Sequence, residues 1–171
     1  MDIKEKGYRL NVGIIVANSD GKLLYCKRKN STNWQFPQGG IDKNEDIFDA
    51  ALRELYEEVG IEENKIKLIK ESDNWYKYDL PKKYKRNSFL WESFKGQKQK
   101  WFLFKLIEET KIDLNNENSP EFDEFNWVDY WKPLDEIVEF KREIYEKVLT
   151  ELEPAYLSLI HISEPTRRLS I

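Results

Sequence analysis

The alternation of apolar and turn-forming residues predicts a β-hairpin at the start of the chain. Residues 8–17 (YRLNVGIIVA) are apolar and β-branched, residues 18–21 (NSDG) have turn composition, and residues 22–28 resume a strand. Arg9 and Arg28 fall at the outer ends of these two strands. A simple hairpin register would bring the two cations near each other; solvent-exposed charges at strand ends are the alternative interpretation.

An amphipathic helix is predicted over residues 46–59. At about 100° per residue, one stripe of this segment is apolar and consists of Phe48, Ala51, Leu52, Leu55 and Val59. Asn44 is the candidate N-cap, and Gly60 lies just past the last helical residue, where helices commonly end. The pattern therefore marks both ends of the helix.

Three carboxylates gather on an adjacent face of this helix. Glu54, Glu57 and Glu58 fall within an arc of roughly 100°. Like charges three and four residues apart repel each other, and the repulsion grows with burial, so the cluster favours a compensating cation. Oxygen ligands prefer Mg²⁺, Mn²⁺ or Ca²⁺ over zinc. The alternative is an acidic helix face that is simply solvated.

The rest of the hydrophobic pattern predicts further strands and a second helix. Residues 65–78 predict one long or bent strand, and residues 96–107 and 120–128 predict two more, with a loop over residues 111–119. Residues 134–152 have helical spacing, with apolar positions at Ile137, Phe140, Ile144, Tyr145 and Val148. This alternation of strands and helices predicts an α/β fold.

Composition narrows the class of protein. The chain has 171 residues, 35% of them charged and 14% aromatic, which suits a single domain. Its net charge of −4 argues against nucleic-acid binding through overall charge, so RNA contacts require local basic patches. Cys26, in an apolar stretch, predicts a core thiol of a reducing compartment. Without a signal peptide or membrane span, we expect a cytoplasmic monomer with no membrane contact.

Residues 79–98 are polar, basic and aromatic, which predicts a functional loop. The segment interleaves cations with aromatic rings: Lys82, Lys83, Lys85 and Arg86 with Tyr84, Phe89 and Trp91. Proteins use this composition to hold phosphates and stack bases. An ordinary solvated loop is the alternative.

The acidic helix lies within a longer motif of fixed spacing. Gly39, Glu45 and the run from Arg53 to Ile61 (RELYEEVGI) match the pattern of the Nudix box at every position, so the chain resembles a Nudix hydrolase. Two further motifs, WQFPQGG at residues 34–40 and GQKQKWF at residues 96–102, resemble the bacterial RNA pyrophosphohydrolase branch. Members of that branch are also described as dinucleoside polyphosphate hydrolases.

The resemblance implies an α/β/α sandwich in which the mixed β-sheet lies between the box helix and a C-terminal helix. It implies hydrolysis of an RNA 5′-triphosphate or diphosphate to a 5′-monophosphate, the step that initiates mRNA decay. A divalent metal, Mg²⁺ or else Mn²⁺, would be held by Glu54, Glu57, Glu58 and Glu121, the last from a Pro-Glu-Phe motif. Either Glu54 or Glu57 would be the general base, which the sequence leaves open.

The remaining members of the motifs receive supporting roles. Arg53 would orient a box carboxylate through a bidentate pair, Glu45 would support the loop, and Gly39 and Gly60 complete the box. The resemblance assigns substrate binding to Arg9, Arg28, Gln97, Val138, Phe140 and Lys141. The basic and amide side chains would grip terminal phosphates, while Phe140 would stack on a base. Core packing is the alternative for Val138 and Phe140.

Two alternative functions are also compatible with these motifs. The same metal site would serve a dinucleoside polyphosphate hydrolase, and a Nudix-fold module that only binds nucleotides or RNA is the non-enzymatic alternative. Asn33, where a serine is often found, and the loop over residues 81–96 depart from the subfamily pattern. Residues 157–171 resemble translated sequencing adapter, so we expect the native domain to span residues 1–156 and assign His161 no function.

Overall fold

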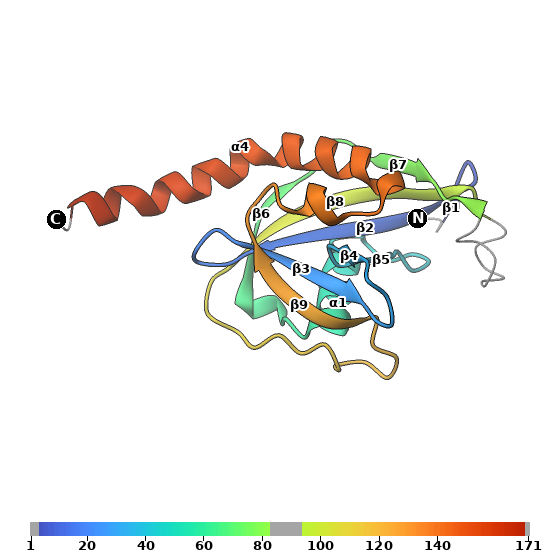
Figure 1. Cartoon of the computed structure of the whole chain (residues 1–171), viewed down its shortest axis with the longest axis horizontal. Coiled ribbons are helices and arrows are strands. Elements are labelled where there is room, and N and C mark those ends of the chain that lie inside the picture. Colours follow the sequence, from blue (N-terminus) through green and yellow to red (C-terminus); the bar gives the residue numbers. More distant parts are fainter. Residues whose placement is uncertain (1–3, 83–93, 170–171) are drawn as a thin grey trace.

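A computed structural model describes residues 4–82 and 94–169 (Figure 1). In these ranges nine strands form one mixed sheet. The strands are β1 (Lys4–Glu5), β2 (Tyr8–Ala17), β3 (Leu23–Arg28), β4 (Trp34–Gln35), β5 (Gln38–Gly40), β6 (Ile66–Glu71), β7 (Tyr76–Asp79), β8 (Gly96–Leu106) and β9 (Phe122–Val128). The helices are α1 (Ile47–Val59), α3 (Pro133–Glu136) and α4 (Glu139–Leu169), with a 3₁₀ turn, η1, over Glu63–Lys65.

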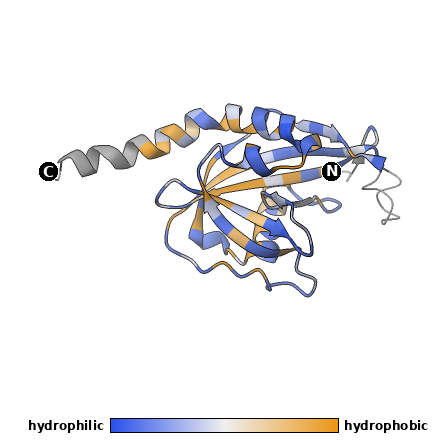
Figure 2. Ribbon diagram, viewed as in Figure 1, coloured by the Kyte–Doolittle hydropathy of each residue, from blue (hydrophilic) through white to orange (hydrophobic). Residues whose placement is uncertain are grey.

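The centre of the sheet is the long parallel pair β2 and β8, which stays in register from Tyr8↔Gly96 to Ala17↔Lys105. Because side chains alternate along a strand, each strand contributes to two cores. Val12 and Ile14 pack in the core on the α1 side, and Ile15 packs in the core beneath α4. Hydrophobic residues gather on these strands (Figure 2). The predicted α/β sandwich with a mixed sheet is confirmed.

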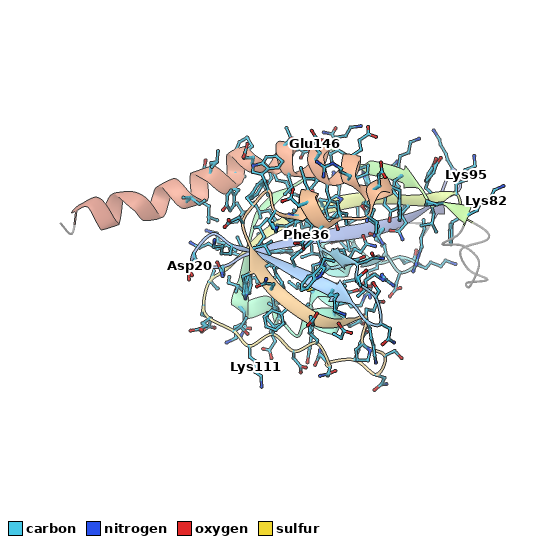
Figure 3. The ribbon with its side chains drawn as sticks, viewed as in Figure 1. Asp20, Phe36, Lys82, Lys95, Lys111 and Glu146 are labelled. Carbon is cyan, nitrogen blue, oxygen red and sulfur yellow. The ribbon has the colours of Figure 1, made fainter. Side chains whose placement is uncertain are left out.

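Aromatic side chains fill the core beneath α4. Phe36 lies near its centre (Figure 3), with its ring centroid 5.1 Å from that of Tyr145 and 5.9 Å from that of Trp101. The backbone N–H of Phe36 donates to the Tyr145 hydroxyl at 3.0 Å. This contact ties the WQFPQGG segment to α4. On the α1 side, Cys26 is buried, as predicted.

The predicted hairpin is present at its turn, but its two strands do not stay paired, so the simple register is not found. Strands β2 and β3 pair only at Ala17↔Leu23, and then diverge. Strand β5 takes the place of β3 beside the outer half of β2, while β3 pairs with β4 and β9. Arg9 and Arg28 are therefore not cross-strand neighbours, because the intervening WQFPQGG segment pairs with both strands.

The start of the box helix also differs from the prediction. The N-cap is Asp46, whose carboxylate accepts from the backbone N–H groups of Phe48 and Asp49. Asn44 instead has a left-handed backbone, with φ of 63°, inside the preceding turn. Gly60 ends the helix as predicted, since its φ of 72° is costly for other residues.

Two other elements differ from their predicted bounds. Residues 72–75 interrupt the long strand predicted over residues 65–78, because Ser72 exchanges backbone and side-chain hydrogen bonds with Trp101 and turns the chain. The C-terminal helix is broken at Ile137, which has an extended backbone, and α4 then runs far beyond residue 152. Within the described ranges, no helix combines the length and apolarity that crossing a membrane requires.

Helix α4 continues through the expected end of the native domain at residue 156. Tyr156 is buried and stacks on Tyr130 at a centroid distance of 4.3 Å, and its hydroxyl donates to the Gly21 carbonyl at 2.5 Å. Ile160 still packs against the same core, so contact with the fold extends into the predicted non-native segment. Beyond it, α4 projects away from the sheet (Figure 1). The adapter origin of residues 157–171 stays a prediction.

The corrected N-cap is testable. Replacing Asp46 removes the acceptor of two backbone N–H groups, so Asp46→Ala should lower the free energy of unfolding by about 1 kcal/mol. Urea denaturation in EDTA measures this without a metal contribution. Asn44→Gly is the control, because glycine keeps the left-handed turn and should change stability by only a few tenths of a kcal/mol. An unchanged midpoint for Asp46→Ala would contradict the assignment.

Candidate active site

Four carboxylates come together where α1 meets the start of β9. Glu54, Glu57 and Glu58 project from α1, and Glu121 is the residue before β9. Glu58 is buried, with 3% of its surface exposed, whereas the side chains of Glu54 and Glu57 are 13% and 43% exposed. The four predicted metal ligands are thus neighbours in space, although 63 residues of sequence separate Glu121 from Glu58.

Gly39 leaves room for one of these carboxylates. It pairs with Val12 in the sheet, and a Cβ added to it would overlap the carboxyl group of Glu54. Any larger residue at this position would push Glu54 away from the strand. The glycine of the box therefore permits the close approach of α1 to β5.

Arg53 binds several box oxygens at once. Its Nε and Nη2 donate to the two carboxylate oxygens of Glu45, both at 2.8 Å. Its Nη1 donates to Glu54 Oε1 at 2.9 Å and to Glu57 Oε2 at 3.3 Å, and its Nη2 also reaches the carbonyl of Gly40 at 2.9 Å. The bidentate partner is thus Glu45, which also accepts from the backbone N–H of Asp42 and braces the loop.

Burial and mutual repulsion dominate the electrostatics of the cluster. Burial raises the pKa of Glu54 to about 7, even though Arg53 acts in the opposite direction. Burial and the neighbouring Glu121 raise the pKa of Glu58 well above its usual range. The hydrogen bonds from Arg53, by contrast, lower the pKa of Glu45. The site therefore favours any cation that offsets the charge of Glu54, Glu58 and Glu121.

The donor set fits a hard divalent cation. Neither carboxylate oxygen of Glu58 accepts a hydrogen bond within the described part of the chain, although both are buried. Buried oxygens of this kind are expected to face a metal or a donor. Among residues 4–82 and 94–169, no three acidic, histidine or cysteine side chains already converge as metal ligands. Arg53 donates to Glu54 and Glu57, so binding a metal would require these two carboxylates to reorient.

Glu117 is a neighbour that the sequence did not single out. Burial together with Glu121 and Glu57 raises the pKa of its carboxyl group, which places it at the margin of the cluster. It belongs to the acid-rich loop over residues 111–119. The excess of acidic residues in this loop was the only sequence signal for Glu117, because no motif includes this residue.

A pocket brings together most of the predicted substrate-binding residues. Arg28, Gln97, Val138, Phe140 and Lys141 all line it, although they come from β3, β8, α4 and the residue before α4. The pocket lies on the α4 side of the sheet. Its lining combines two cations, amide groups and aromatic rings, a set of groups suited to phosphates and a nucleobase.

Arg9 takes a separate position next to the box. A Cβ added to Gly40 would overlap the Arg9 guanidinium, so this side chain lies against the β5 backbone. The carbonyl of the same glycine accepts from Arg53. Arg9 is not part of the pocket lining, but the strand register pairs it with Gln97, which is.

The pocket also contains residues that sequence reasoning missed. Gln35 is buried, its Oε1 accepts from Lys141 Nζ at 3.4 Å, and its Nε2 has no partner in the described ranges. Tyr78 packs on Phe140 at a centroid distance of 5.7 Å. Burial and the nearby Arg28 lower the pKa of Lys141 to about 7. Gln35 belongs to the WQFPQGG motif, which was the available signal, whereas nothing in the sequence marked Tyr78.

The predicted basic and aromatic loop is described only at its two ends. Its remaining members, Lys83, Tyr84, Lys85, Arg86, Phe89 and Trp91, lie outside the described residues. Leu80 lines the pocket. The loop is shorter than residues 79–98, because Asp79 belongs to β7 and residues 96–98 belong to β8, in agreement with the strand predicted from residue 96. Their position in the strand aligns Gln97 with Arg9 of β2.

The fold and the box define the class of protein. A family model for the NUDIX domain matches residues 7–148, which is most of the 171-residue chain. The chain belongs to the NUDIX family.

The chain is similar in sequence to several proteins of one name and similar in fold to a solved structure. The chain is 47% identical over 149 residues to the RNA pyrophosphohydrolase of Vibrio cholerae serotype O1, covering 85% of this chain and 84% of the relative. It is 43% identical over 162 residues to the protein of the same name from Haemophilus ducreyi, covering 94% and 82%. The Escherichia coli dihydroneopterin triphosphate pyrophosphohydrolase has the same fold, with a TM-score of 0.66, 19% identity, and coverage of 85% and 99%.

The electrostatic account of the cluster predicts opposite effects of one substitution with and without metal. Burial and Glu121 raise the pKa of Glu58, so this carboxyl group disfavours the folded state at neutral pH. Glu58→Gln removes that cost and offers an amide that can donate to Glu121, so metal-free protein should gain about 1 kcal/mol of unfolding free energy. The same variant should lose most of the rise in melting temperature that Mg²⁺ gives the parent protein. Calorimetry in EDTA and in Mg²⁺ measures both. A metal-free variant less stable than the parent would contradict the account.

Proposed function

We propose that this protein is an RNA pyrophosphohydrolase, which converts an RNA 5′-triphosphate or diphosphate to a 5′-monophosphate and thereby initiates mRNA decay. One observation carries the proposal: the pocket formed by Arg28, Gln97, Phe140 and Lys141 adjoins the WQFPQGG segment that leads into the Nudix box. A metal site and a site for phosphates and a base are thus joined by a few residues. Relatives of that name at 43–47% identity support it.

In this proposal Glu54, Glu57, Glu58 and Glu121 hold a divalent metal, Mg²⁺ or else Mn²⁺. When bound, such metals neutralise phosphate oxygens and acidify water for attack on phosphorus. Glu54 or Glu57 takes the proton from the attacking water. Arg53 acts as a positioning residue, because it ties both of these glutamates to Glu45 and the Gly40 carbonyl.

The substrate is held from two sides. Arg28, Gln97 and Lys141 contact its phosphates from the pocket, and Arg9 does so from beside Gly40. Phe140 stacks on a base, with Val138 beside it at the pocket wall. Burial and Arg28 lower the pKa of Lys141, so a phosphate bound beside it would favour its charged form.

We also propose a cellular compartment and an oligomeric state for this protein. We place it in the cytoplasm, where bacterial mRNA is degraded, since the relatives are bacterial RNA hydrolases by name. We further propose a monomer, because one chain supplies both the carboxylates and the pocket.

The substrate is tested by a rate comparison in Mg²⁺. Initial rates would be measured on 5′-triphosphorylated RNA, 5′-diphosphorylated RNA and diadenosine tetraphosphate, with Glu57→Gln as the inactive control. The proposal predicts faster hydrolysis of RNA than of the dinucleotide. A strong preference for diadenosine tetraphosphate would assign the site to dinucleoside polyphosphates, and binding without turnover would indicate a non-enzymatic module.

The role of the pocket cation is tested separately. Arg28→Ala should raise KM for triphosphorylated RNA roughly tenfold and change kcat little, because the lost contact is made in both ground and transition states. Lys29→Ala is the matched control, since Lys29 is the exposed neighbour outside the pocket lining. Equal KM values for the two variants would contradict the assignment of Arg28.

A further inference from the structure

Three lysines form a basic patch on the face of the sheet opposite the pocket. Lys77 of β7 pairs directly with Lys98 of β8, and Lys100 follows on β8 two residues later. Because side chains alternate, Lys98 and Lys100 lie on the same face as Phe102, which packs in the α1-side core. We call Lys77, Lys98 and Lys100 the lysine platform.

Two aromatic rings fix the ammonium groups of the platform. Lys77 Nζ lies 5.1 Å from the centroid of the Tyr8 ring. Lys98 Nζ and Lys100 Nζ lie 5.5 Å and 5.7 Å from the centroid of the Trp75 ring. Attraction to the ring faces limits the movement of these flexible side chains. Their positive charges are therefore held in place before any partner binds.

Two of the platform lysines, Lys77 and Lys98, are directly opposed on neighbouring strands. Like charges on directly opposed residues of neighbouring strands destabilise a sheet. Two acidic residues lie nearby. Asp79 Oδ1 accepts from the Tyr8 hydroxyl at 2.6 Å, and Asp73, which pairs with Lys70 at 2.8 Å, accepts through its backbone carbonyl from Lys100 Nζ at 3.3 Å. The sheet has a second opposed lysine pair, Lys67 and Lys105, on the other face. The aromatic rings and the nearness to the catalytic residues distinguish the platform from that pair.

The platform lies close to both parts of the proposed site. Tyr78 and Gln97 line the pocket, and their sequence neighbours Lys77 and Lys98 point to the opposite face. Within the described residues β7 pairs with β8 alone, so only one edge strand separates pocket and platform. The register also places Lys100 two strands from Gly39, which is about 10 Å.

We propose that the lysine platform binds backbone phosphates of single-stranded RNA downstream of the nucleotide held in the pocket. The inference rests on the proposed function, because it requires an RNA end in the pocket. The strand passes around the β7 edge and meets ammonium groups that read no sequence. With a net charge of −4, the protein depends on such a local patch to attract RNA.

Chain length and salt dependence test this proposal. The substrates are a 5′-triphosphorylated dinucleotide and a single strand of about 12 nucleotides, assayed with Mg²⁺. The platform variant combines Lys77→Gln, Lys98→Gln and Lys100→Gln. The control removes the same charge elsewhere, through Lys67→Gln, Lys105→Gln and Lys147→Gln.

The platform variant should lose roughly tenfold in kcat/KM on the longer strand at low salt and retain the parent value on the dinucleotide. Its plot of log kcat/KM against log salt should flatten by about 2, since each phosphate contact to a single strand contributes roughly 0.7. The control should match the parent protein on both substrates. Equal losses on both substrates, or no loss on the longer strand, would overturn the proposal.

A binding measurement separates this proposal from the proposed function. Fluorescence anisotropy with a 5′-monophosphorylated strand requires no catalysis, and the platform variant should bind it roughly tenfold more weakly than the control. Lack of turnover of both the dinucleotide and the longer strand by the parent protein would refute the proposed function alone. If the triple variant does not fold, Lys77→Gln should show about a third of the change in salt slope, and an unchanged slope would overturn the proposal.

Discussion

The constraint on which this structure depends is the crowding of carboxylates at one edge of the box helix. Glu58 is buried beside Glu54 and Glu121, and mutual repulsion opposes the folded state whenever no cation is present. Such an arrangement persists only if other contacts hold the helix in place. In this protein α1 buries Leu55 and Val59 against the sheet on one side, so the core stabilises what the acidic side destabilises.

A small number of polar contacts turn that crowding into a defined site. Arg53 joins Glu45, Glu54 and Glu57 through hydrogen bonds of 2.8–3.3 Å. Its guanidinium group therefore binds both the loop before α1 and α1 itself. Gly39 and Gly40 allow close approach from both faces of β5, one for Glu54 and one for Arg9. The WQFPQGG segment therefore links the carboxylates on one face of the sheet to the pocket on the other.

Features that depend on residues close together in the sequence were predicted correctly more often than features that depend on distant residues. The box spacing, the apolar stripe of α1 and the Gly60 cap depend on residues within a few turns of each other, and each was predicted. The choice of Asp46 over Asn44 as N-cap depended on the turn that Glu45 and Arg53 hold. Two nearby residues of similar capping ability could not be separated by local preference alone.

Non-local pairing accounts for the remaining differences. The two hairpin strands do not stay paired because β5, which follows β3 in the sequence, takes the place of β3 beside the outer half of β2. Gln35 and Tyr78 enter the pocket only because β4 and β7 converge beneath α4. The resemblance to the family predicted five of the lining residues: Arg28, Gln97, Val138, Phe140 and Lys141. Hydrophobic periodicity could not predict them, because it carries no information on contacts between distant segments.

The central claim is that the crowded carboxylates of α1, together with Glu121 just before β9, form a metal site. Anomalous diffraction from crystals grown with Mn²⁺ tests it most directly. The account predicts an anomalous peak within coordination distance of Glu54 or Glu57, Glu58 and Glu121, at about 2.0–2.2 Å from their oxygens. A Mn²⁺ peak elsewhere, with these four side chains unchanged and unliganded, would contradict it.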